Sequence, residues 1–393
     1  MLQAAKKPVV NPNWASVFAI TFTGILLLAS EFLPVAILTP IAADLQITEG
    51  HAGQSISIAG LFALFTGLFI APVIGRADRK RVALYLISLM LASGVVVASA
   101  SNSAFLMIGR AMIGVAIGGF WALTTAIVIR LVPEDKVPKA LALINGGNAI
   151  AATVAAPLGS YLSSIIGWRA AFGLIVPLAA IALIWFWRAL PSLSSEQQPK
   201  SVKDVFGLFK NFRFASGAVA IGLFNTGHFA FFTYLRPFLD VVTNNDPMAV
   251  SGMLFTFGFA GIVGSSWISI LLKKHLFVAL TLLPLTMAAL GVGLITVGGA
   301  QLYALVLLFG WGMLIVSVQV SWWTWLSRTM AHEAEAAGGL MVAIIQVSIT
   351  LGAGVGGVLF DAAGYTASFG FAVAMLCASA LVASLAARAG VPG

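Results

Sequence analysis

Residues 14–40 read WASVFAITFTGILLLASEFLPVAILTP, a run in which Glu31 is the only charged residue. A helix rises about 1.5 Å per residue, so about 20 apolar residues cross the roughly 30 Å hydrocarbon core of a bilayer. The start of the chain lacks the short apolar core and cleavage site of a signal peptide. We therefore predict that this run is a retained transmembrane helix.

The composition of the whole chain agrees with a membrane protein. Of its 393 residues, 60% are hydrophobic and 9% are charged, whereas soluble domains carry about 25% charged residues. The net charge of +8 could suggest nucleic acid as a partner. Basic residues in short loops between spans explain it better, so we expect lipid and no nucleic acid. Cys377 is the single cysteine, which excludes an intramolecular disulfide.

Charges, prolines and glycine clusters divide the chain into twelve apolar segments. The fold class is therefore predicted to be an all-α membrane protein with twelve transmembrane helices. These helices are expected at 14–40, 52–75, 82–101, 104–130, 138–165, 168–188, 213–238, 249–272, 276–298, 301–327, 337–360 and 366–388.

The distribution of basic residues predicts the orientation of the spans. An even number of spans places both termini on one side, and loops rich in Lys and Arg face the cytoplasm. With cytoplasmic termini, only Arg169 and Arg236 fall on the outer side and Arg110 falls inside a span, which leaves 18 of the 21 Lys and Arg residues on the cytoplasmic side. The asymmetry supports both the span count and the orientation.

The two halves of the chain match at an offset of 197 residues. Gly159, Gly167 and Phe172 correspond to Gly356, Gly364 and Phe369, and Phe32 and Pro40 correspond to Phe229 and Pro237. Six helices repeated in the same orientation imply two pseudo-symmetric bundles with the substrate between them. We predict bundles at 1–190 and 213–393, joined by a cytoplasmic linker at 191–212. The alternative is chance matching in a chain rich in Gly and Phe.

Three ionisable residues fall within the spans, where a charge is costly and function is the default hypothesis. Glu31, Arg110 and His228 lie at similar depth, somewhat outside the midplane, and Glu31 and His228 are repeat partners. A carboxyl group in a low-dielectric setting resists ionisation, so Glu31 could carry a coupling proton. Arg110 could favour its release, and His228 could titrate or contact a polar ligand. The alternatives are a static Glu31–Arg110 pair and a packing histidine.

Polar and aromatic residues near the same depth are candidates for the substrate path. An amide can instead simply bridge two helices, and an aromatic side chain can simply pack. Besides His228, we select Phe32, Trp121, Asn145, Asn148, Asn225, Phe231, Phe232, Tyr234, Trp311 and Gln346.

Glycine and proline mark candidate gating elements. Pro157 and Gly159 lie within one span, where Pro interrupts the backbone hydrogen bonds and Gly allows close packing. A weakened helix against a tight interface could form a gating seam, although close packing alone explains these residues equally well.

Several motifs resemble the major facilitator superfamily along the whole chain. Residues 75–81, GRADRKR, resemble its cytoplasmic loop signature, although the second glycine is missing. Arg110, Gly114 and Gly118 match a spacing that the superfamily ties to proton coupling, and 156–159, APLG, resemble a variant of its antiporter signature. The resemblance implies conformational roles for Gly75, Asp78, Arg79, Arg81, Gly114, Gly118, Pro157 and Gly159.

Within that superfamily, residues 31–34, EFLP, and 39–42, TPIA, resemble the drug:proton antiporters with twelve spans. Residues 119–122, GFWA, and 231–237, FFTYLRP, resemble the bacterial purine ribonucleoside efflux pumps most closely. This resemblance implies proton-coupled export of inosine or guanosine across a bacterial inner membrane, without a cofactor. The alternative is a multidrug or sugar exporter of the same superfamily. We expect a monomer and, because no nucleophile, metal or phosphate-loop motif occurs, no enzyme.

Overall fold

The computed structural model describes residues 13–193, 207–272, 275–330 and 334–388. Within these ranges the chain is helical and has no β-strand, which confirms the predicted all-α fold class. The predicted linker 191–212 lies mostly outside the described residues, so its boundaries stay a prediction.

The helices follow one another with short connections. The first half contains α1 (Trp14–Ala36), α2 (Leu38–Leu45), α3 (Glu49–Ile74), α4 (Arg79–Ala98), α5 (Ser103–Leu131), α6 (Val137–Ile166), α7 (Trp168–Gly173) and α8 (Ile175–Ala189). The second half contains α10 (Phe212–Thr233), α11 (Leu235–Val242), α12 (Pro247–Leu272), α13 (Leu276–Thr296), α14 (Gln301–Thr329) and α15 (Ala334–Arg388).

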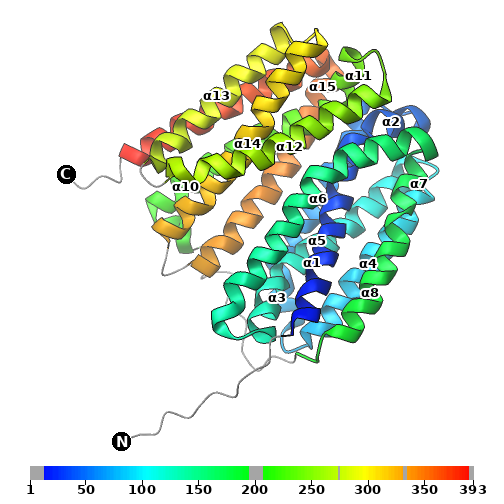
Figure 1. The fold of residues 1–393 in the computed structure, drawn as a ribbon, viewed down its shortest axis with the longest axis vertical. Coiled ribbons are helices and arrows are strands. Elements are labelled where there is room, and N and C mark those ends of the chain that lie inside the picture. The colour runs from blue at the N-terminus through cyan, green and yellow to red at the C-terminus, as the bar shows by residue number, and fades with distance from the viewer. Residues whose placement is uncertain (1–12, 194–206, 273–274, 331–333, 389–393) are drawn as a thin grey trace, which may run out of the picture.

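The number of spans in the described residues agrees with the predicted twelve. Ten helical segments are long and apolar enough to cross a membrane, and the bent pair α10–α11 provides an eleventh. One of the ten, α15, is 55 residues long, and its backbone leaves the helical region at Ala363 and Gly364. A straight helix of this length would extend for about 80 Å, far beyond a bilayer. The chain instead rises (orange) and returns (red), so α15 supplies two spans (Figure 1).

The internal repeat is visible in the breaks of the helices. α1 ends at Ala36 and α2 begins at Leu38, and 197 residues later α10 ends at Thr233 and α11 begins at Leu235. Gly167 and Gly364, also 197 apart, both have positive φ, at 81° and 73°.

A proline explains each break between the paired helices. Pro40 and Pro237 are the third residues of α2 and α11. A proline removes the hydrogen bond to the carbonyl four residues earlier and its ring clashes there. Those carbonyls belong to Ala36 and Thr233, the last residues of α1 and α10. The same residue type at the same repeat position therefore bends both first spans.

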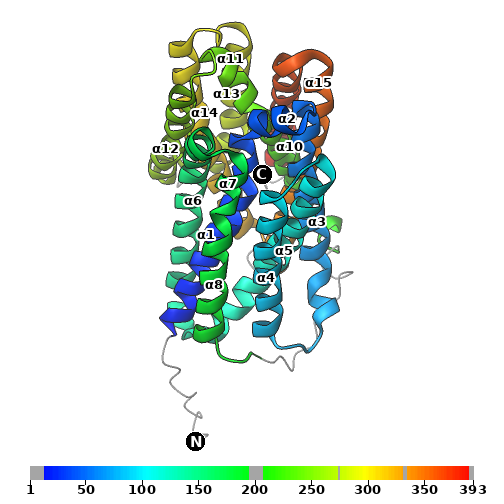
Figure 2. The ribbon, with the colours of Figure 1, turned by 90° about the vertical axis from the view of Figure 1, so that its right-hand side faces the viewer.

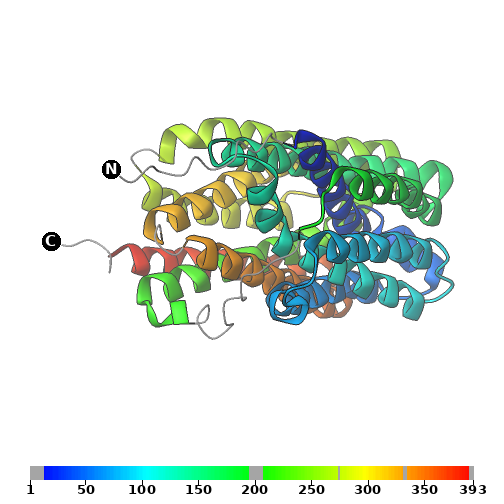
Figure 3. The same cartoon turned by 90° about the horizontal axis from the view of Figure 1, so that it is seen from below.

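The two bundles touch at one end of the molecule and diverge at the other (Figures 1 and 2). We call the end that contains α2 and α11 the contact side, and the end where α1 begins at Trp14 the divergent side. Across the boundary, α3 packs on α15 and α6 packs on α12. Seen from below, the first bundle (blue to green) and the second (light green to red) lie next to each other (Figure 3).

Candidate functional site

Arg110 lies fully inside the first bundle and is held by backbone carbonyls. Its guanidinium donates to the oxygens of Ser30 at 2.7 Å and Glu31 at 3.2 Å in α1, and to that of Ser55 at 3.2 Å in α3. In the described part of the chain, Arg110 and the Glu31 carboxylate form no direct ion pair. Arg110 therefore ties α5 to α1 and α3, while its charge stays close to Glu31.

Glu31 is buried at the boundary between the bundles. Its carboxyl group hydrogen-bonds the side chain of Gln346, which belongs to α15 in the other bundle and is itself buried. Gln346 also lies beside Gly60 of α3, where a methyl group would come within 3.2 Å of its backbone oxygen. Two residues selected separately from the sequence therefore meet, and a titratable group of the first bundle contacts a side chain of the second.

His228 is oriented by a neighbouring tryptophan. The indole N–H of Trp311 on α14 donates to His228 Nδ1 at 3.3 Å. An indole nitrogen can only donate, so Nδ1 must be the unprotonated nitrogen of a neutral imidazole. The proton is then on Nε2, which has no hydrogen-bond partner among the described residues. His228 thus presents one fixed N–H donor.

Aromatic rings surround His228 and reach across the boundary. His228 stacks on Phe232 with centroids 5.4 Å apart, and Phe232 stacks on Phe257 at 5.6 Å. Phe32 of α1 packs edge-on against Phe232 at 5.8 Å and stacks on Phe229, its repeat partner, at 6.4 Å. We call His228, Phe32, Phe229, Phe232 and Phe257 the aromatic cluster. The cluster therefore combines aromatic rings from both bundles with one polar edge, that of His228.

Three other predicted substrate residues are occupied by packing within the second bundle. Phe231 and Trp311 are completely buried and stack on each other with centroids 3.9 Å apart. Asn225 donates to the Ile221 oxygen and accepts from Gln319 at 2.7 Å, so it bridges α10 and α14. In the structure these three side chains therefore pack or bridge two helices, as in the alternative interpretation given in the sequence analysis.

In the first bundle, Trp121 and Asn148 lie together beside Gly24 of α1. A methyl group at Gly24 would come within 3.0 Å of the Trp121 ring and 3.2 Å of Asn148 Oδ1. Asn148 Oδ1 is buried and lacks a hydrogen-bond partner among the described residues. Asn145, one turn earlier on α6, is exposed.

Tyr234 lies on the contact side rather than in the aromatic cluster. Its hydroxyl donates to the Ala353 oxygen at 2.8 Å, and its ring stacks on Phe360 at 5.1 Å. The hydroxyl also lies so close to Gly53 of α3 that any side chain there would collide with it. Tyr234 therefore fills the seam between α3 and α15.

The predicted gating glycines are sites of close helix packing. A methyl group at Gly114 or Gly118 of α5 would collide with the backbone oxygens of Ala59 or Ala63 of α3. On α6, Pro157 is buried, and a methyl group at Gly159 would collide with Leu33 of α1. The structure thus shows contacts within one bundle at these positions, and a gating role stays a prediction.

The loop after α3 is fixed to the end of α8. Gly75 has a φ of 49°, and its oxygen accepts from Arg79 at 2.9 Å. Asp78 caps α4 by accepting the N–H of Lys80, and it also accepts from Ser192 and from the N–H of Leu193.

These contacts determine the protonation of Asp78, which lies outside the membrane spans. Burial alone would raise the pKa of Asp78, but the three hydrogen bonds and the nearby charge of Arg81 lower it below its ordinary value. Asp78 is therefore ionised at neutral pH, and the loop and the end of α8 depend on that charge.

An aspartate that the sequence analysis did not select joins the bundles on the contact side. Asp361 of α15 accepts from the Thr48 hydroxyl at 2.7 Å and from the Gly50 N–H at 2.9 Å. Thr48 directly precedes α3, and Gly50 lies in its first turn, where the N–H groups have no partner within the helix. A carboxylate of one bundle therefore caps a helix of the other.

The contact continues along α3 and α15 for more than two turns. Gln54 donates to the Gly354 oxygen at 3.1 Å, and the Ser57 hydroxyl donates to the Thr350 oxygen. Further towards the divergent side, a methyl group at Gly67 of α3 would meet only Gly118 of α5. These hydrogen bonds between α3 and α15 thus lie towards the contact side.

Arg236 makes a second connection that the sequence analysis did not anticipate. It pairs with Asp240 at 2.9 Å and donates across the boundary to Ser160 at 2.8 Å and to the Ala36 oxygen at 2.7 Å. The Ala36 oxygen is the carbonyl that Pro40 leaves without a partner. The repeat pointed to this contact. Pro40 and Pro237 each leave one backbone carbonyl beside the bend without a helical partner, and such a carbonyl can accept a hydrogen bond from another segment.

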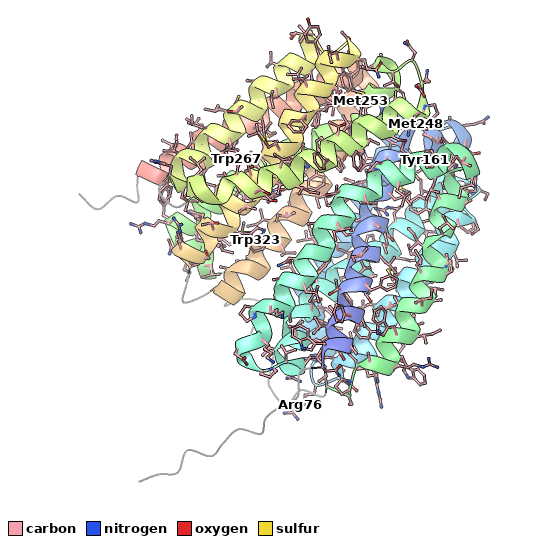
Figure 4. The ribbon with its side chains drawn as sticks, viewed as in Figure 1. Arg76, Tyr161, Met248, Met253, Trp267 and Trp323 are labelled. Carbon is pink, nitrogen blue, oxygen red and sulfur yellow. The ribbon has the colours of Figure 1, made fainter. Side chains whose placement is uncertain are left out.

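The labelled side chains show the same closeness at one end of the bundles and the same separation at the other. Tyr161 of α6 and Met248 of α12 lie near the contact side, whereas Arg76 and Trp323 lie towards the divergent side on different bundles (Figure 4). The conformation therefore brings the bundles together at one membrane face only.

Comparison with known proteins agrees with this architecture. Residues 20–353 match the family described as the Major Facilitator Superfamily. The chain belongs to that superfamily. Its members transport solutes, which confirms the expectation of a transporter rather than an enzyme.

Two relatives match almost the whole chain. The transcription regulatory protein OpdE of Pseudomonas aeruginosa is 46% identical over 392 residues, which cover 99% of this chain and 98% of OpdE. The purine ribonucleoside efflux pump NepI of Salmonella typhimurium is 39% identical over 380 residues, which cover 97% and 96%.

Solved structures share the fold at low identity. The nucleoside transporter NupG, in a mutant form, matches with a TM-score of 0.73 and 14% identity over 96% of this chain and 100% of NupG. A bacterial homologue of the human lysosomal transporter Spinster, in an inward-facing and unoccupied conformation, matches with a TM-score of 0.72 and 14% identity over 96% and 95%.

Proposed function

We propose that this protein exports purine ribonucleosides such as inosine and guanosine in exchange for protons, by alternating access in a bacterial inner membrane. Both termini lie in the cytoplasm, and the protein works as a monomer without a cofactor. In this orientation, which the basic loops favour, the divergent side faces the cytoplasm. The described conformation is then the one that receives cargo from inside the cell.

The aromatic cluster is the observation that carries the cargo proposal. It combines the flat faces of Phe32, Phe232 and Phe257 with one polar edge, the Nε2–H of His228. Stacking of a base on aromatic rings contributes about 1–3 kcal/mol. The 39% identity to NepI, whose name specifies purine ribonucleosides, supports the same class. The name of OpdE refers to regulation, so it says nothing about a cargo.

The contact between Glu31 and Gln346 supports proton coupling. Glu31 belongs to α1 and Gln346 to α15, so the hydrogen bond spans both bundles. An ionised carboxylate can only accept hydrogen bonds, whereas the protonated form also donates one. Proton uptake from outside changes this contact, favours cargo release and allows the bundles to return. Arg110 supplies a nearby positive charge that favours later release of the proton.

The rival function is export of drugs or sugars by the same machinery. Glu31 and Arg110 would serve either cargo, so only the surroundings of His228 distinguish the two. A sugar has no flat aromatic face to stack on Phe232, and many drugs lack a hydrogen-bonding edge beside such a face. The ring geometry therefore favours nucleosides.

Everted membrane vesicles test this function directly. With an interior made acidic by respiration, the wild-type protein should accumulate labelled inosine, and dissipating the proton gradient should abolish uptake. Chloramphenicol and a sugar analogue should compete poorly.

His228→Ala should lower inosine uptake, whereas His275→Ala, which changes an exposed histidine before α13, should not. Uptake of the drug or the sugar but not of inosine would overturn the proposed cargo.

A further inference from the structure

The hydrogen bond between Trp311 and His228 has a consequence for selectivity. Trp311 is completely buried against Phe231, so it cannot itself touch a ligand. Its indole N–H nevertheless points at His228 Nδ1. Of the two ring nitrogens of a neutral imidazole, the one that accepts a hydrogen bond cannot carry the proton.

We propose that Trp311 is a positioning residue that holds the proton of His228 on Nε2 and so makes the site selective for 6-oxopurine over 6-aminopurine ribonucleosides. This inference rests on the proposed function and names the subclass of its cargo. It follows from what the locked ring can offer, which is one donor and no acceptor.

The two kinds of purine differ at the edge that such a donor would meet. A 6-oxopurine presents two adjacent acceptors, N7 and O6. A 6-aminopurine presents the N7 acceptor beside an amino group that donates. A fixed N–H therefore pairs well with the first edge and confronts a second donor on the other. A site built to hydrogen-bond one group discriminates strongly against an analogue that leaves a polar group unpaired.

The aromatic cluster keeps this edge in place. The imidazole is nearly parallel to the Phe232 ring, with 17° between the planes, and Phe229 packs edge-on against it at 5.1 Å. A ring flip, which would place Cδ2 instead of Nδ1 opposite the indole N–H, must disturb both contacts as well as the hydrogen bond to Trp311. The orientation and the tautomer are thus fixed together.

A matched pair of variants tests the role of Trp311. Trp311→Phe keeps an aromatic ring but removes the N–H that locks His228. Trp322→Phe changes another buried tryptophan of α14, whose indole N–H has no partner among the described residues.

The nitrogen-15 spectrum of histidine side chains in the full-length protein should show a single Nε2–H tautomer for His228 in the wild type and in Trp322→Phe. Trp311→Phe should show exchange between tautomers, and His228→Gln identifies the signal. An unchanged His228 signal in Trp311→Phe would overturn the positioning role.

Competition between inosine and adenosine tests the selectivity. The wild type and Trp322→Phe should prefer inosine by about tenfold, which corresponds to about 1.4 kcal/mol. In Trp311→Phe the preference should fall below about threefold. An unchanged preference in that variant, or no preference in the wild type, would overturn the proposed selectivity. If the wild type binds neither nucleoside, the proposed cargo fails with it, while the tautomer spectrum still decides whether Trp311 positions His228.

Discussion

Asp361 accepts the backbone N–H of Gly50 at 2.9 Å, so a carboxylate of the second bundle caps a helix of the first. The same turn also has a local cap, because the hydroxyl of Thr48, just before α3, accepts the N–H of His51 at 3.1 Å. The contribution of Asp361 exists only while the bundles touch on the contact side. We therefore expect it to favour the conformation in which the bundles touch.

Removing this cap should favour opening of the contact side. Loss of an N-cap costs about 0.5–2 kcal/mol, so Asp361→Ala should shift the conformational equilibrium by about 2- to 30-fold. Spin labels at exposed positions Ile165 and Phe255, on α6 and α12, would report a growing long-distance population. Asp246→Ala is the matched control, because Asp246 caps α12 within its own bundle. An equal shift in both variants would contradict the account.

Gly53→Ala should oppose closure of the same side. The added methyl group collides with the Tyr234 hydroxyl, and overpacking costs about 1–3 kcal/mol. The rate of inosine transport in proteoliposomes should fall by roughly 5- to 150-fold. Gly146→Ala, at a glycine of α6 with open space around it, should transport normally. Combining Gly53→Ala with Tyr234→Ala should restore part of the rate, and strictly additive losses would argue against the collision.

Arg110→Lys should destabilise the protein more than Glu31→Gln does. A lysine cannot reproduce the fork of donors that reaches three carbonyls on two helices. A lost charged hydrogen bond costs about 1.5–3 kcal/mol. Thermal unfolding in detergent should therefore show a lower midpoint for Arg110→Lys and a nearly unchanged one for Glu31→Gln. The reverse order would mean that a direct Glu31–Arg110 pair holds the bundle together.

Asp78→Asn should destabilise the loop after α3 in a pH-dependent way. The folded pKa of Asp78 lies below its ordinary value, so its charge contributes stability at neutral pH that is lost as the pH falls through the folded pKa. The difference in unfolding midpoint from wild type should be largest near pH 7 and shrink in acid. Asp135→Asn, at an exposed position in the short 3-10 helix Glu134–Lys136 before α6, provides the comparison. A difference that stays constant down to strongly acidic pH would exclude this role of the charge.

The sequence predicted the architecture because the bilayer imposes simple rules on it. Apolar length marks each span, basic loops mark one face, and the offset of 197 residues placed Pro40 and Pro237 at matching bends. The sequence also identified Glu31 and Gln346 as candidates, because a polar group at that depth in the membrane is costly and is therefore a hypothesis of function. Their contact across the boundary required the structure, since no local pattern relates α1 to α15.

The assignment of aromatic and basic residues shows where local rules end. Phe231 and Phe232 follow His228 by three and four residues, so helical spacing places both within about 60° of it. Only Phe232 stacks on His228, whereas Phe231 stacks on Trp311 of α14, a distinction that required the structure. Arg236 was counted as a loop charge, whereas it is buried between the bundles because the Ala36 oxygen and Ser160 receive it. Such partners come from distant segments, which a charge count cannot identify.

The most direct test of proton-coupled export compares two modes of transport in one variant. Glu31→Gln keeps the shape of the side chain but cannot carry the coupling proton. In proteoliposomes, it should lose inosine accumulation driven by a pH gradient, while inosine–inosine exchange without a gradient continues at near wild-type rate. Gradient-driven accumulation by Glu31→Gln equal to that of the wild type would contradict the account.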